Sequence, residues 1–152
     1  MTDYTNISAT LQGKLINDGK LCPVDLFESY IEKINNNSDS GFIFSEILEK
    51  SGRNEAKASR KRAKNNNRLS KLDGICISWK DLFEIHNHET KAGSKLLDGN
   101  ISKQTAKVIQ NSSFSGITSI GRTHMTELAF SGLGLNPSTA TPPNAITKSL
   151  VP

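Results

Sequence analysis

The sequence has few cysteines, no long apolar run and no secretion signal, which are the usual features of secreted and membrane proteins. It has two cysteines, Cys22 and Cys76, too few and too far apart for a disulfide framework or a cysteine-based metal knuckle. No apolar run approaches the roughly 20 residues needed to cross a bilayer, and the first residues lack the basic-then-apolar pattern of a secretion signal. We therefore expect a cytoplasmic protein with no membrane partner.

Apolar residues are also scarce. They make up 35% of the 152 residues and aromatic residues 6%. This apolar share is low for a globular protein, yet far from the composition of a disordered chain. The length is sufficient for one domain with a modest hydrophobic core.

Acidic residues are nearly absent from one stretch of the chain. Between Arg53 and Lys71, eight Lys or Arg residues occur against one acid, Glu55, in a chain whose net charge is +4. Such a run could contact nucleic acid or an acidic membrane. No aromatic side chain interleaves with it to stack on bases, and charged helix positions usually only solvate one face. We therefore interpret the run as the exposed face of one helix and do not expect nucleic acid as a partner.

Hydrophobic periodicity predicts helices. Apolar residues recur at helical spacing over residues 7–18, 23–34, 45–64 and 103–112. The third of these carries a stripe of mostly small residues, which would let it pack closely against a neighbour. Residues 42–44 are too short to assign, as a small strand or as the apolar start of the helix that follows.

Two strands are predicted in the second half of the chain. Alternating apolar residues predict a strand that ends at Lys80, and glycines bracket a second over residues 116–121. With the helix between them they form a βαβ-like unit, which predicts an α/β fold whose sheet has parallel neighbours and helices on its faces. A lysine at a strand end is usually only a surface residue.

His86 and His88 are spaced two residues apart and could in principle share a metal ion. A site needs three or four converging ligands, and the neighbouring sequence does not supply them. We expect a loop or strand edge here, with no metal and no cofactor.

Two longer blocks resemble a known family. Residues 72–83 read LDGICISWKDLF, with AGSKLL at residues 92–97, and residues 120–137 read IGRTHMTELAFSGLGLNP. In composition, order and spacing these blocks are similar to the amidase signature family, over nearly the whole chain. The resemblance implies the N-terminal portion of the amidase-signature fold, a mixed β-sheet flanked by helices, incomplete in this chain. It also implies a single, truncated domain over residues 1–152, mainly helical over 1–70, with the start of the α/β catalytic core over 71–152.

The resemblance also implies a chemistry. Members of the family hydrolyse or transfer amide groups with a Ser-cisSer-Lys triad, and Lys80 matches the catalytic lysine. Such a base must be partly deprotonated, which burial at a strand end would favour. A small-molecule amide is the implied substrate. The segment matching the substrate entrance of the family consists of Ser131, Gly132, Leu133 and Gly134, with a plain loop as the alternative.

The sequence also departs from the family pattern. Both serines of the triad are missing, because the chain stops at Val151-Pro152, where a Gly/Ser-rich motif should begin. Cys76 stands where proline is usual, His124 where asparagine is usual, and residues 138–140 where a His-Tyr-Gly type run is common.

Several hypotheses follow from the missing serines. The first is an amidase fragment that is inactive alone and that a complementary C-terminal chain would complete. The alternatives are a component like the glutamine-hydrolysing subunit of the tRNA-dependent amidotransferases, and a non-catalytic remnant.

Overall fold

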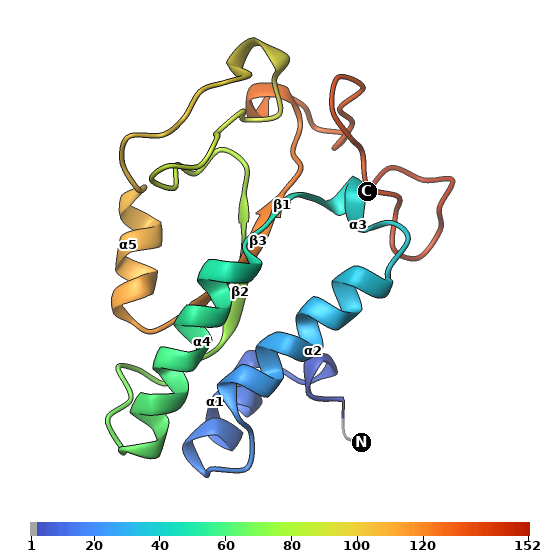
Figure 1. Ribbon diagram of the computed structural model, residues 1–152. Helices are drawn as coiled ribbons and strands as arrows, with labels where there is room; N and C mark the ends of the chain where they lie inside the picture. The colour runs from blue at the N-terminus through green and yellow to red at the C-terminus, as the bar shows by residue number, and fades with distance from the viewer. Residues whose placement is uncertain (1–2) are drawn as a thin grey trace. The chain divides into compact units, whose positions relative to one another are not determined.

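The computed structural model describes residues 3–152 (Figure 1). These residues divide into two compact units of interleaved segments. The first unit contains the chain up to Asn36 together with Leu48–Ser78 and Gln110–Ile120. The second unit contains Asn37–Ile47, Trp79–Ile109 and Gly121–Pro152. Within residues 3–152, no helix has both the length and the apolar character required to cross a membrane.

The first two helices form where the periodicity predicts them. A short 3-10 turn, η1 (Tyr4–Asn6), precedes α1 (Ala9–Asn17), which starts after Ser8, whose hydroxyl accepts a hydrogen bond from Leu11 N–H. The second helix, α2 (Pro23–Asn36), begins with a proline, a residue suited to the first helical position. The core of the first unit is a cluster of buried residues from both helices, the link between them and the chain just before residue 76: Ile16, Leu26, Leu21 and Ile75.

The third long helix, α4 (Glu49–Lys64), confirms the predicted stripe of small residues. Gly52, Ala56 and Ser59 are its buried positions, and α4 lies beside α2 (Figure 1). A Cβ atom at Gly52 would lie 2.6 Å from the Phe27 ring and would also clash with the carbonyl oxygen of Ser119. The absence of a side chain at Gly52 therefore allows the close packing.

The predicted start of this helix is wrong. The periodicity predicts a helix from Ser45, but a short α3 (Ser40–Ile43) is followed by the strand β1 (Phe44–Ile47), and α4 begins only at Glu49. The cause is pairing with a distant part of the chain, since β1 pairs antiparallel with residues 121–123. Such a partner cannot be seen in local periodicity.

Three strands form one mixed sheet in the order β1-β3-β2, where β2 is Cys76–Lys80 and β3 is Thr118–Thr123. Hydrogen bonds from Thr118 N–H to Ile75 O (2.8 Å) and from Asp81 N–H to Thr123 O (3.0 Å) run in the same order along both strands. The strands β2 and β3 are therefore parallel, and α5 (Lys107–Phe114) lies between them in sequence. The predicted βαβ unit and the mixed α/β fold are confirmed.

The remaining chain is mostly irregular. The last predicted helix starts at Lys107 rather than residue 103, because Ala106 N–H donates instead to Glu84 O (2.8 Å). Two further 3-10 turns, η2 (Lys95–Leu97) and η3 (Glu127–Ala129), interrupt the loops.

Candidate functional site

Lys80 is the last residue of β2, the position predicted from the sequence. The strand holds it through its neighbours, since Trp79 is buried and Asp81 N–H donates to Thr123 O of β3. Its own side chain is exposed, whereas the resemblance implies burial. Within residues 3–152 its ammonium group makes no ion pair or hydrogen bond. The backbone of Lys80 is therefore held in place, while its side-chain amine is exposed.

A buried ion pair follows Lys80 directly. The guanidinium group of Arg122, in β3, lies 2.5 Å from the carboxylate of Asp81, and both side chains are almost fully buried. Burial raises the pKa of the Asp81 carboxyl, and the positive charge of Arg122 opposes this rise. Arg122 also donates to Thr90 Oγ1 (3.1 Å) and to the carbonyl oxygen of Glu89. The pair therefore ties β3 to the chain that leaves Lys80.

The two sequence blocks that carry the family resemblance meet in space. The buried Ser94 hydroxyl, from the first block, donates to the Glu127 carboxylate of the second (2.7 Å). Leu128 N–H donates to Ala92 O (2.8 Å). Ala92, Leu128 and Ala129 all have positive φ angles, which are costly for non-glycine residues. Backbone strain of this kind is concentrated at functional sites, so the junction of the blocks is part of the candidate site.

Asn136 is the polar centre of this junction. Its buried side-chain amide donates to the carbonyl oxygens of Gly93 and Met125, both at 2.7 Å. Its side-chain oxygen accepts from the N–H groups of Ser138 and Thr139. A Cβ atom at Gly93 would lie 2.8 Å from the Asn136 amide nitrogen, so the glycine is needed for this approach. Asn136 thus fixes the chain on both sides of the predicted substrate segment.

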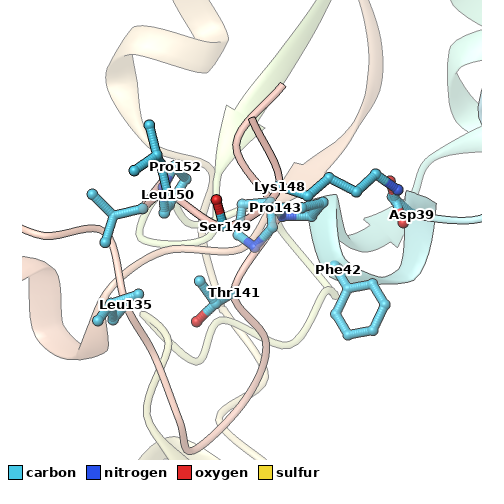
Figure 2. Close-up of a pocket in the computed structure, with 11 residues that line it drawn as sticks. Asp39, Phe42, Leu135, Thr141, Pro143, Lys148, Ser149, Leu150 and Pro152 are labelled. Atoms are coloured by element: carbon cyan, nitrogen blue, oxygen red, sulfur yellow. The ribbon is translucent and has the colours of Figure 1, made fainter. Parts of the chain in front are cut away.

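The predicted substrate segment, residues 131–134, lies on the surface just before Asn136. Ser131, Gly132 and Leu133 are exposed, Gly134 is half-buried, and the Ser131 hydroxyl accepts from Leu133 N–H. The next residue, Leu135, lines a pocket of about 410 Å³ with Phe42, Thr141 and residues 148–152 (Figure 2). Among the described residues, no hydrogen bond or ion pair joins this segment to Lys80, although both belong to the second unit.

Metal ligands do not gather in residues 3–152: no group of three or more His, Cys, Asp or Glu side chains there could hold an ion. The two predicted loop histidines face different partners. His86 Nδ1 lies 3.0 Å from Lys103 O, and His88 Nδ1 lies 2.6 Å from the Glu46 carboxylate. Burial raises the pKa of the Cys76 thiol to about 12, so Cys76 is not a thiolate nucleophile at neutral pH.

Comparison with known proteins identifies the family. A family model described as Amidase matches residues 25–152. The chain belongs to the amidase family. Among curated proteins it is 32% identical over 138 residues to one subunit of the glutamyl-tRNA(Gln) amidotransferase of Neisseria gonorrhoeae, covering 90% of this chain and 27% of that protein.

Solved structures share the amidase fold. A chain from a vestigial complex that bears on the origins of an s-triazine catabolic enzyme superposes with a TM-score of 0.89 at 22% identity, over 95% of this chain and 32% of that one. Fatty acid amide hydrolase gives a TM-score of 0.82 at 21% identity, over 92% of this chain and 25% of that one. This amidase chain therefore spans about a quarter of the length of the curated relative.

Two of the departures from the amidase pattern lie together. His124 and residues 138–140 line one cavity of about 460 Å³, which Asp81, Arg122 and Lys95 also line. Each of these two departures can be seen in the sequence by itself. That His124 and residues 138–140 lie together depends on the turn that the Asn136 side chain stabilises. The ion pair between Asp81 and Arg122 does not follow from the sequence, although both residues lie within the two resembling blocks.

Proposed function

We propose that this chain supplies the lysine-bearing N-terminal part of an enzyme that hydrolyses carboxamide C–N bonds to a carboxylate and ammonia or an amine. The observation that carries the proposal is the position of Lys80, at the end of β2, immediately before the buried pair of Asp81 and Arg122. The backbone on both sides of Lys80 is fixed, while its amine is free to contact other groups. Fixed placement of this kind is what a catalytic base requires.

In the proposed reaction, neutral Lys80 is the general base. It takes a proton, through a bridging serine, from a nucleophilic serine that attacks the amide carbon. The protonated relay then gives a proton to the leaving amine as the C–N bond breaks, and an acyl-serine ester remains. Water, deprotonated through the same relay, hydrolyses this ester to release the carboxylate and restore the serine. Backbone N–H groups stabilise the oxyanion in both steps. Residues 131–134 contact the substrate mainly through backbone groups.

We propose that both serines of this relay lie outside the 152 residues and that the chain alone does not turn over amides. Removing the nucleophile of such a triad removes most catalysis and leaves little beyond binding. The exposed amine of Lys80 supports this reading, since residues 3–152 provide it with no hydrogen-bonding partner. The partners of the complete site are a small-molecule amide and a complementary C-terminal polypeptide.

A chimera tests the amidase assignment. Residues 25–152 would replace the matched stretch of the Neisseria protein, and release of ammonia from a panel of carboxamides would be measured. We expect a cooperatively folded chimera to hydrolyse at least one amide above the rate of the same chimera with Lys80→Ala. A folded chimera with no lysine-dependent hydrolysis of any amide would contradict the proposal.

A second candidate is a component like the glutamine-hydrolysing subunit of a tRNA-dependent amidotransferase. The name of the curated relatives favours it, whereas the run of residues 131–137 is more like that of free-standing amidases. The same panel of carboxamides distinguishes an amidotransferase component from a free-standing amidase. Hydrolysis confined to glutamine supports the amidotransferase component, and hydrolysis of unrelated carboxamides supports a free-standing amidase.

A further inference from the structure

A second feature of the molecule, independent of Lys80, lies in the first unit. Two grooves there share one lining residue, Asn17, at the end of α1. One groove, of about 410 Å³, is lined by the cations Arg60 and Lys64 of α4. The other, of about 700 Å³, is lined by three cations, Lys14, Arg68 and Lys71. We call these five residues the groove cations.

The groove cations come from three segments that the fold draws together. The absence of a side chain at Gly13 lets the carbonyl of Lys71 lie against α1, since a Cβ atom there would clash with it. Arg68 closes the contact by donating to Gly13 O (3.0 Å). The basic run is therefore more than the exposed face of one helix: α1 and the loop after α4 contribute to the same surface.

The positive charge of these grooves is not neutralised by carboxylates. None of the groove cations forms an ion pair within residues 3–152, and the Arg68 guanidinium bonds only to backbone carbonyls. Asp18 is the one acid that lines either groove in the described part of the chain. By contrast, Arg62 of the same run is paired with Asp73 at 2.7 Å. Five cations without a carboxylate partner, against one acid, favour a polyanionic partner.

We propose that the grooves bind the sugar-phosphate backbone of double-stranded RNA. Cations bind phosphates, and no aromatic side chain among residues 3–152 lines either groove, which disfavours stacking on single-stranded bases. The uncharged polar side chains that line the grooves and make no other side-chain hydrogen bond within the described residues suit the ribose 2′-hydroxyl, which both donates and accepts hydrogen bonds. They are Thr10, Asn17 and Asn66.

Fluorescence anisotropy of the full chain with a labelled RNA duplex of about 16 base pairs, the span of a typical double-stranded RNA module, tests this. If the four exposed groove cations, Lys14, Arg60, Lys64 and Lys71, contact phosphates, log K against log salt concentration should fall with a slope of roughly −3 to −4. Arg60→Gln with Lys71→Gln should weaken binding about tenfold and reduce the steepness of the slope by about 2. The matched control is Lys103→Gln with Lys107→Gln, two exposed lysines elsewhere that carry the same charge change. This control variant should leave the affinity and the slope with salt concentration unchanged.

Three results would overturn the proposal. One is an equal loss of affinity in the control variant, which would indicate attraction by net charge alone. Another is tighter binding to single-stranded RNA or to a DNA duplex of the same sequence. The third is binding to vesicles containing anionic phospholipid with no measurable binding to RNA duplex at about 50 mM salt. Both variants change exposed residues, and circular dichroism would verify that each remains folded.

Discussion

Glu55 is the single acid within the basic run, and it is turned inward from α4. Its carboxylate accepts a hydrogen bond from Ser119 N–H (2.7 Å), yet burial raises its pKa above the ordinary value for glutamate. A carboxyl whose pKa is raised on folding binds its proton more tightly in the folded state. Its contribution to stability is therefore present at low pH and lost as pH rises through the raised pKa.

The substitution Glu55→Gln keeps an acceptor for Ser119 N–H and removes the titration. We expect the variant to gain stability relative to the parent chain as pH rises from about 4 to about 7, as measured by urea unfolding. The exposed acid Glu32, changed to Gln, is the control and should show no such trend. A stability difference that is flat or reversed with pH for Glu55→Gln would contradict the account.

The Asn136 side chain contributes to stability, and this contribution can be measured. In Asn136→Ala, two buried carbonyls and two N–H groups lose their partner, so we expect a loss of about 2–4 kcal/mol in the free energy of unfolding. Asn144 is a matched control, because its side chain makes the same kind of turn contacts at an exposed site. Asn144→Ala should cost no more than about 1 kcal/mol. Equal losses in both variants would show that Asn136 is not a structural centre.

At the scale of elements, the packing of α4 against α2 depends on Gly52. Gly52→Ala forces a Cβ atom against the Phe27 ring and the backbone of β3, and we expect destabilisation of roughly 2–3 kcal/mol. At Gly41, in the exposed α3, a Cβ atom meets nothing within 4 Å. Gly41→Ala should be neutral or stabilising by up to about 1 kcal/mol. Thermal melts of both variants would test the contrast, and a stable Gly52→Ala chain would count against close packing there.

At this scale the sequence could predict the helices and strands that depend on residues close together in the chain. The helices α1, α2 and most of α4 follow from apolar spacing and capping residues, and β2 from alternation ending at Lys80. The strand β1 could not be predicted, because its partner lies in β3, far along the chain. The same holds at the candidate site. A local motif is enough to predict the position of Lys80, whereas the hydrogen bond between Asn136 and Gly93 joins residues 43 positions apart.

At the scale of the whole molecule, the chain covers 27% of its curated relative and belongs to the same family. We expect the purified 152-residue chain to release no ammonia from any carboxamide above the buffer rate. The reason is that, under the proposed function, this chain supplies the base without the nucleophile, and a base alone gives only a small part of the catalysis. Turnover that disappears in Lys80→Ala would show that the chain holds a complete site of another kind.

The central claim is that Lys80 is the base, and the most direct measurement is the rate of amide hydrolysis by the chimera carrying residues 25–152. Lys80→Ala should lower kcat/KM by about 10³-fold or more, while the exposed Lys103→Ala should leave it within about threefold. A Lys80→Ala chimera that stays folded and hydrolyses within about tenfold of its parent would contradict the account.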